Sequence, residues 1–439
     1  MACVRLAAIA VMLLGLCSSQ LHAGETLRAE ARRRHDDLVK VGFNFTHGLT
    51  VGAAPARVEF LVPPSDETHE LYLWFAATKG LISIRVVGPN GEAITSWKAT
   101  RGEQRIVRRL LPGKYVAEID GGPGEGVLGV KGPVIGRCEI DAHQLAEHAA
   151  EPRNGFHWPY LLITPKMKRA TVLLVLPNNG GFISEDVQLL RAAATCQARS
   201  ELEMADRLGA AILIPLFPRP SVGGEMDNLY LHALSRAALE TKVPKFARVD
   251  LQLIAMVDHA RALLGDGVDR RVLIEGFSAA GMFSNRFAVL HPERTLAAAI
   301  GSPGGWPIAP VASAGLTYPV GLADAQQLTG AKIDERALRA VAFFFFLGAE
   351  DNNDSVPYRD SFSATDAAVI MRRFGKTPVD RWENARKLYI AAGLHATFKL
   401  YQGVGHSITT QMHADMEAMF QAAVASESRL PERADTTAP

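Results

Sequence analysis

The stretch 271–290, RVLIEGFSAAGMFSNRFAVL, decides the fold of this chain. It begins as an apolar run and continues, after Ser278, as an amphipathic segment, which predicts a strand that turns sharply into a helix. Gly276 and Ala280 are small, so the two arms of this turn do not collide, and Gly281 gives further room. The hydroxyl of Ser278 is therefore expected above the sheet at a helix N-terminus, where a developing oxyanion is stabilised, and the N–H of Ala279 comes next.

The pattern Gly-x-Ser-x-Ala resembles the nucleophile elbow of the α/β-hydrolase superfamily, with alanine where the commonest form has its last glycine. Taken alone, the match also fits a glycine-rich turn without any chemistry. The strand before it, the helix after it and the partners that follow in chain order favour the catalytic interpretation.

Near-continuous apolar runs recur after Pro159, of the kind that is buried on both faces of a parallel sheet. They cover residues 171–176, 210–215, 272–274, 296–300, 341–347 and 397–401. Helical segments are expected between them, among them 251–264, with Asp250 as its cap, and 382–392. The predicted fold is α/β, a doubly wound and mostly parallel sheet over residues 157–425.

A nucleophilic serine needs a base and an acid, and in α/β-hydrolases they follow it in the order acid, then histidine. The predicted strand 343–347 ends in GAED (348–351), which resembles the acid loop of the superfamily. Asp351 is the preferred acid, and Asp354 is an alternative because the loop has extra residues. His406 follows a glycine just past the last predicted strand, where the catalytic histidine of the superfamily lies.

The oxyanion hole is expected to combine the N–H of Ala279 with a second N–H from the loop 177–181, PNNGG. That loop stands where many lipases and esterases have His-Gly-Gly-Gly. Which residue of the loop supplies this N–H is left open by one position, and Asn179 is chosen for this role. Candidate substrate contacts are Asn178, Trp306 and His232, which lies in an insertion (217–248) expected to form a wall or lid. Simple packing is the alternative for Trp306 and His232.

Residues 24–140 differ from the rest of the chain in their sequence pattern. Short β-branched or aromatic runs lie at 58–62, 70–75, 81–87 and 115–119, separated by turn signals and without helical segments between them. This spacing predicts a small antiparallel β-sandwich, loosely similar to jelly-roll domains of secreted bacterial hydrolases. The Gly/Pro-rich stretch 121–136 is expected to be its closing loop, and 141–156 a linker. For Trp74 and Trp97, core packing is favoured over a carbohydrate- or polymer-binding platform.

Residues 1–23 resemble a secretory signal peptide, with Arg5 before an apolar run at 6–16. The expected cut follows Ala23, with Ser19 as the alternative, so the protein is expected to be secreted or periplasmic. Cys138 and Cys196 then remain, either as one disulfide or as two separate thiols. No spacing of Cys and His suggests a metal site, and the polar tail 426–439 is expected to be disordered.

The composition is that of a globular protein long enough for two domains. The chain has 439 residues, of which 48% are hydrophobic and 21% charged, and its formal net charge is +1. A nearly neutral chain gives no support for nucleic-acid binding. After the leader, no apolar run approaches the roughly 18 residues of a membrane span.

The oxyanion loop, the elbow, the acid loop and the histidine occur in the order of the α/β-hydrolase superfamily. The stretch 283–305 is most similar to secreted esterases related to polyhydroxybutyrate depolymerases and feruloyl esterases. This resemblance implies a serine esterase that forms an acyl-enzyme on Ser278 and needs no cofactor. Three alternatives stay open: a serine peptidase of the prolyl-oligopeptidase type, a polyester (polyhydroxyalkanoate) depolymerase, and a non-catalytic binding protein on the same scaffold. The sequence leaves the oligomeric state open.

Overall fold

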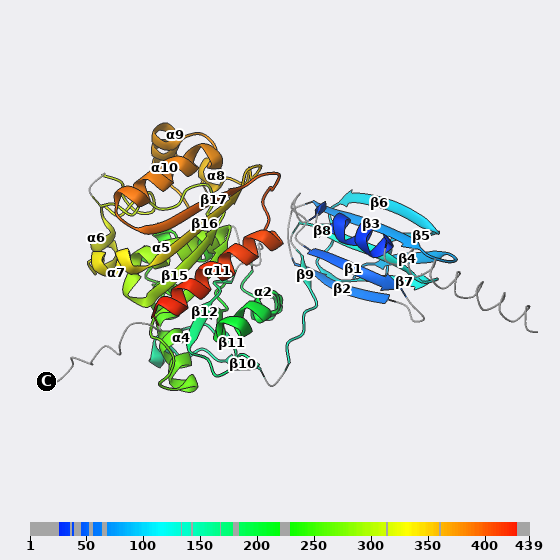
Figure 1. Ribbon diagram of the computed structural model, residues 1–439, viewed down its shortest axis with the longest axis horizontal. Coiled ribbons are helices and arrows are strands. Elements are labelled where there is room, and N and C mark those ends of the chain that lie inside the picture. Colours follow the sequence, from blue (N-terminus) through cyan, green and yellow to red (C-terminus); the bar gives the residue numbers. More distant parts are fainter. Residues whose placement is uncertain are drawn as a thin grey trace, which may run out of the picture. The chain divides into compact units, whose positions relative to one another are not determined.

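The computed structural model describes residues 26–35, 37–38, 45–51, 56–63, 68–132, 134–141, 144–166, 168–178, 184–219, 229–312, 315–359 and 361–427. The chain divides into two compact units, Met1–Arg137 and Cys138–Pro439 (Figure 1). The expected signal peptide, Asn179 and all but the first two residues of the expected tail lie outside the described residues.

The first unit is β-rich and antiparallel. One sheet has the order β1 (Phe45–Val51), β8 (Gly124–Lys131), β3 (His69–Ala77), β6 (Arg101–Arg108). The other has the order β5 (Ala93–Ala99), β4 (Ile82–Val87), β7 (Gly113–Gly121), β2 (Ala56–Val62), β9 (Ile135–Gly136). Apolar side chains of both sheets, such as Leu73 from the first and Phe60 from the second, share one hydrophobic core.

The glycine-rich stretch 121–136 is not the closing loop that its composition suggests. It contains β8, which pairs with β1 on one side and β3 on the other. A Cβ on Gly124 would lie 2.4 Å from the backbone oxygen of Ala76, and one on Gly126 would lie 2.9 Å from that of Trp74. The glycines permit a close approach to the neighbouring strand, so here they mark a strand.

Both tryptophans of the first unit pack within it. Trp74 is 2% exposed and lies in a small core with Leu38 from the helical residues 26–35 and 37–38, while the Arg34 guanidinium lies 4.8 Å from the centre of the Trp74 ring. The ring centres of Trp97 and Phe75 are 4.6 Å apart, and the two rings pack edge to face. Core packing therefore accounts for both side chains.

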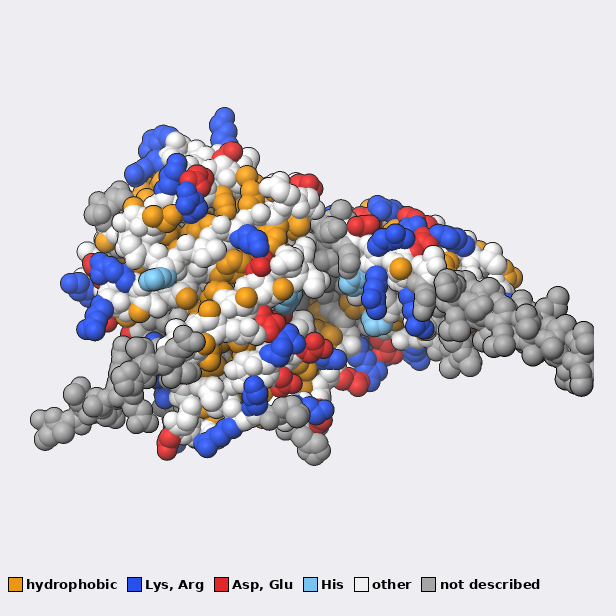
Figure 2. Space-filling model, viewed as in Figure 1, with side chains coloured by type: hydrophobic (Ala, Val, Ile, Leu, Met, Phe, Trp, Pro, Cys, Tyr) orange, Lys and Arg blue, Asp and Glu red, His pale blue; other side chains and the backbone are white. Residues whose placement is uncertain are grey.

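Positive and negative side chains are interspersed on the visible face of the first unit (Figure 2). Arg34 pairs with Glu103 at 2.9 Å, and Arg105 pairs with Glu70 at 3.4 Å. These exposed pairs neutralise one another locally and contribute little to the free energy of unfolding.

The second unit is built on one mixed sheet with the strand order β10-β11-β13-β12-β14-β15-β16-β17. The bounds are β10 (Leu145–His148), β11 (Tyr160–Ile163), β12 (Val172–Val175), β13 (Ala210–Pro215), β14 (Val272–Phe277), β15 (Thr295–Gly301), β16 (Ala342–Gly348) and β17 (His395–Tyr401). β11 pairs antiparallel with both of its neighbours, β10 and β13. The remaining neighbours in the order β13-β12-β14-β15-β16-β17 all pair parallel. The six apolar runs in the sequence thus form β12 to β17, whereas β10 and β11 lie outside them.

Helices pack against both faces of this sheet. The longer ones are α2 (Val187–Leu208), α4 (Val249–Leu264), α5 (Ala279–Leu290), α9 (Ala364–Phe374), α10 (Pro378–Ala391) and α11 (Thr410–Glu427), and the short ones include α8 (Ser355–Tyr358). Side chains of α4, α5 and α10 share a core with one face, whereas α2 and α11 contact each other and the sheet, side by side in Figure 1. None of the helices in the described residues is long and apolar enough to cross a bilayer.

Two local expectations need correction in the second unit. The expected linker 141–156 contains β10, which pairs with β11. Its sequence, LAEH, has little intrinsic strand preference, so tertiary pairing decides its conformation. Asp250 does not cap α4: the cap position is Arg248, and Asp250 lies in the first turn, where it binds side chains.

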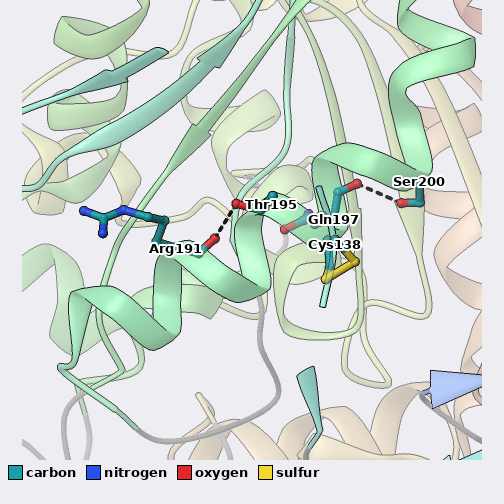
Figure 3. Close-up of a disulfide and its surroundings, with 6 residues drawn as sticks. Cys138, Arg191, Thr195, Gln197 and Ser200 are labelled. Carbon is teal, nitrogen blue, oxygen red and sulfur yellow. Dashed lines mark hydrogen bonds between the residues drawn. A yellow bond between two sulfur atoms is a disulfide. The ribbon is translucent and has the colours of Figure 1, made fainter. Parts of the chain in front are cut away.

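A disulfide joins Cys138, the first residue of the second unit, to Cys196 in the middle of α2 (Figure 3). The two Cα atoms are 4.9 Å apart, and the bond closes a loop across 58 positions of the chain. Next to Cys196, the Gln197 side-chain amide donates to the backbone oxygen of Pro177, which is 3.3 Å away and two residues past the end of β12. The disulfide thus fixes the start of this unit to a helix that also contacts the carboxyl edge of the sheet.

Candidate active site

Ser278 lies alone between β14, which ends at Phe277, and α5, which begins at Ala279. Its backbone angles are φ 60° and ψ −123°, a conformation that residues with a side chain rarely adopt. The Ser278 N–H donates to the Gly301 oxygen at 2.9 Å, and the Met282 N–H donates to the Ser278 oxygen at 3.0 Å. The serine is therefore held in a strained turn at the carboxyl end of a central strand and at the N-terminus of a buried helix.

The small residues around Ser278 are required by close backbone contacts. A Cβ on Gly276 would lie 2.1 Å from the Ala280 oxygen, and one on Gly281 would lie 2.4 Å from the Gly301 oxygen. Real Cβ atoms do not approach backbone oxygens so closely, so the strand and helix can meet at this angle only with glycine at both positions.

Gly276→Ala is expected to lower the free energy of unfolding of the second unit by about 1–3 kcal/mol, because the added methyl overpacks the turn. Urea unfolding followed by tryptophan fluorescence measures the change. Gly267→Ala is the matched control, since its Cβ meets no heavy atom within 4 Å. Equal stability of the two variants would show that the turn is not tightly packed.

His406 and Asp351 are in direct contact. The His406 Nδ1 lies 2.9 Å from the Asp351 Oδ2, and the other carboxylate oxygen accepts the Asn353 N–H at 2.9 Å. The loops that carry the two residues are joined, because the Glu350 N–H donates to the Val404 oxygen at 2.9 Å. With Nδ1 bound to the carboxylate, Nε2 is the nitrogen left for a reacting group.

The imidazole also lies next to the strained turn. Its ring centre is 4.6 Å from that of Phe277, the residue before the serine. Within the described residues, Ser278 Oγ and His406 make no hydrogen bond with each other. In proteins without a bound substrate such a bond is often long, and it tightens when the substrate binds.

The carboxyl of Asp351 is held in its charged form. Burial alone would raise its pKa, but the hydrogen bond and the charge of His406, with smaller contributions from Ser302 and the Asn353 N–H, lower the pKa below its ordinary value. An ionised carboxylate at Nδ1 fixes the tautomer of the imidazole and stabilises the imidazolium.

Asp354, the alternative acid, has different partners. Its Oδ1 accepts from the Arg381 Nη1 at 2.8 Å and from the Val356 N–H at 3.1 Å, where Asp354 caps α8. The Arg381 side chain is fully buried. The carboxylate of Asp354 therefore balances a buried guanidinium, and it is Asp351 that meets the histidine.

Of the two expected oxyanion donors, the structure describes only Ala279. Ala279 is the first residue of α5, so its N–H belongs to the first turn and has no acceptor within the helix. Asn179 lies outside the described residues. The preceding Asn178 is buried, and its amide exchanges two hydrogen bonds with the backbone of Phe217, at 2.8 and 3.1 Å. Both ends of that amide are thus occupied by main chain.

The other two candidate substrate contacts are packed in the interior. Trp306 is 1% exposed, stacks on Phe374 at 4.2 Å and donates its indole N–H to the Val320 oxygen at 3.0 Å. His232 is also buried, and its Nε2 lies 2.8 Å from the Phe217 oxygen. Burial lowers the pKa of His232 to about 4. Neither side chain is open to a substrate in this structure.

Sequence reasoning missed two buried acidic residues, one of which, Glu275, lies three positions before Ser278. Glu275 of β14 is buried, and this burial, together with the nearby charge of Glu201 on α2, raises its pKa well above the ordinary value. The Oε2 atom of Glu201 in turn lies 3.5 Å from the Nδ1 atom of His413 on α11. The available signal was a charged residue within the apolar run VLIEGF.

A small hollow lies beside the acid loop, and its lining includes Ser302, Gly305, Asn353 and Trp382. Its empty volume is about 240 Å³ including the open mouth. In the part of the chain that the structure describes, no group of three or more His, Cys, Asp or Glu side chains is arranged to hold a metal ion.

No protein-family model matches the sequence, and no curated protein matches it. Solved structures similar to this chain include poly(aspartic acid) hydrolase-1 from Sphingomonas sp. KT-1, with 19% identity, 64% of this chain and 97% of that chain covered, and a TM-score of 0.42. An S-formylglutathione hydrolase from Agrobacterium tumefaciens has 15% identity, coverage of 64% and 94%, and a TM-score of 0.36. A putative dienelactone hydrolase from Klebsiella pneumoniae has 17% identity, coverage of 64% and 98%, and a TM-score of 0.34. These TM-scores are too low to bear on the substrate.

Proposed function

We propose that this protein is a serine hydrolase of the α/β-hydrolase type that cleaves carboxylic esters through an acyl-enzyme on Ser278. One observation carries the proposal: Ser278 stands in a strained turn at a helix N-terminus, beside a histidine whose Nδ1 is bound to a buried carboxylate. Nucleophile, base and orienting acid are the three groups that acyl transfer through a serine requires.

In the first half of the reaction, His406 Nε2 takes the proton of Ser278 while Oγ attacks the ester carbonyl. Asp351 stabilises the imidazolium that forms. The tetrahedral intermediate then collapses, the bond to the alkoxy oxygen breaks, and His406 returns its proton to the leaving alcohol. In the second half, water gives a proton to His406, attacks the acyl carbon, and releases the acid with Ser278 restored.

The negative charge of each tetrahedral intermediate needs donors aimed at the oxygen. We assign this role to the N–H of Ala279, at the start of α5, and to that of Asn179, which follows β12 in the sequence. The positive end of the α5 dipole adds to the same stabilisation. The mechanism needs no cofactor.

The finer assignment is a secreted esterase of the kind related to polyhydroxybutyrate depolymerases and feruloyl esterases. Residues 24–140 form its accessory β-domain and 157–425 its catalytic domain. Export is supported by the leader-like sequence at 1–23 and by the Cys138–Cys196 disulfide, which is typical of oxidising compartments. A polymeric ester is the substrate in the depolymerase alternative, with the β-domain as anchor.

A panel of p-nitrophenyl esters of increasing acyl length tests this function. We expect turnover with a burst of p-nitrophenol equal to the enzyme concentration, and a transient mass increase of one acyl group, because the acyl-enzyme accumulates when deacylation is slow. Ser278→Ala is the control and should show neither. Cleavage of peptide amides but not esters would instead favour the peptidase alternative.

A further inference from the structure

The end of β15 lies between the strands that carry the serine and the acid. The Gly301 oxygen accepts the Ser278 N–H at 2.9 Å, and the next residue, Ser302, donates its N–H to the Phe346 oxygen of β16 at 2.9 Å. Two consecutive residues thus bind the backbone of both neighbouring strands at the carboxyl edge of the sheet. Any side chain at position 302 is placed beside the acid loop, and Ser302 and Asn353 line the same hollow.

The conformation and burial of Ser302 are unusual for a serine. Its φ is 42°, in the left-handed region that favours glycine, and the residue is 3% exposed. Its hydroxyl oxygen is buried and makes no hydrogen bond of good geometry within the described residues. The acid loop lies beside it, since Ser302 lines the same hollow as Asn353, two residues after Asp351. The hydroxyl is also one of the groups that lower the pKa of Asp351, after the effects of burial and of His406.

We propose that Ser302 is a positioning residue for the reaction, whose hydroxyl donates a hydrogen bond to Asp351 and holds this carboxylate against His406. The inference rests on the proposed function. A buried hydroxyl without a partner is costly, and a carboxylate is the strongest acceptor within its reach.

The carboxylate has capacity for a third donor. It accepts one bond from His406 and one from the Asn353 N–H, and an ionised carboxyl group offers about four acceptor positions. His406 is the titratable group that faces it. The charges nearby, Asp354 at the N-cap of α8 and Arg381 on α10, bind each other. A third donor keeps the carboxylate ionised and oriented while the imidazole gains and loses its proton.

The test compares Ser302→Ala with Ser284→Ala, which removes another buried hydroxyl that has no hydrogen-bond partner in the described residues. The first readout is the carboxyl carbon of Asp351, followed by NMR as the pH is varied. In Ser302→Ala its titration should move to higher pH, because a donor to the charged form is lost. In Ser284→Ala it should stay in place. This readout needs no turnover, so it applies even if the proposed function fails.

The second readout is the pH profile of ester hydrolysis. Ser302→Ala should lower kcat about tenfold with KM unchanged, the effect expected of one hydrogen bond to a charged group. Its acidic limb should move to higher pH, since a more basic carboxylate holds the imidazolium more tightly. An unmoved Asp351 titration would overturn the contact. A moved titration with unchanged kcat and pH profile would overturn the positioning role, and so would a loss of stability alone.

Discussion

His406→Ala and Asp351→Asn are each expected to lower kcat for ester hydrolysis by about 10⁴-fold. Without His406 no base takes the serine proton. With asparagine at 351 the partner of His406 Nδ1 is neutral, so the imidazolium loses its stabilising charge and the tautomer is no longer fixed. Steady-state kinetics on variants with a wild-type thermal unfolding transition measure both effects, and KM should change little.

Asp354→Asn separates the two possible acids. Asp354 balances the buried Arg381, so the variant should lose stability, while the molecules that remain folded keep most of their activity. If Asp354→Asn removed activity at full stability and Asp351→Asn did not, the acid would be Asp354, and the contact between His406 and Asp351 would have no part in the reaction.

Asp250→Asn is expected to lower the free energy of unfolding by about 3–5 kcal/mol, because it leaves buried charges without their partner. Asp250 is completely buried, 2.7 Å from the Arg248 Nη2 and 2.8 Å from the His291 Nε2. Asp258, on the same helix, pairs with Arg294 at the surface. Asp258→Asn is the matched control and should change stability by less than about 1 kcal/mol. Urea unfolding gives both values.

The pH dependence of this cluster follows from two pKa shifts of opposite sign. Burial would raise the pKa of Asp250, but the hydrogen bonds of His291 and Arg248 lower it to about 2, so its contribution is lost as the pH falls below the ordinary value of 3.8. Burial would lower the pKa of His291, but Asp250 raises it above 6.5, so its contribution is lost as the pH rises through that raised value. The stability difference between wild type and Asp250→Asn should therefore be largest between pH 3.8 and 6.5. A difference independent of pH would contradict this account.

The sequence predicts those parts of the fold in which local pattern and tertiary packing agree. Apolar runs such as 272–274 and 341–347 became strands of the large sheet because such runs are buried on both faces. The prediction failed at β8 and β10, where glycines or polar residues adopt strand pairing imposed by their neighbours. It also failed at Asp250, because a cap and a buried ion pair look alike in sequence.

The candidate site was inferred from the order of motifs along the chain. The order of elements pointed to Ser278 and His406 and favoured Asp351 with Asp354 as the alternative. Both acids lie in one loop, and only its folded shape shows that Asp351 contacts the histidine. The candidate contacts Trp306 and His232 turned out to be buried, because their environment depends on distant segments. The sequence did not indicate a role for Ser302, since its place beside the acid loop depends on how β15 and β16 pair.

The most direct test of the central claim is labelling of the purified full chain with a fluorophosphonate, followed by mass spectrometry of its peptides. An activated serine attacks phosphorus and displaces fluoride, whereas ordinary serines do not react. We expect one adduct per chain, on the peptide that contains Ser278, and no adduct in a folded Ser278→Ala variant. A folded wild-type protein that stays unlabelled, or a variant that is labelled as readily, would contradict the claim that Ser278 is a catalytic nucleophile.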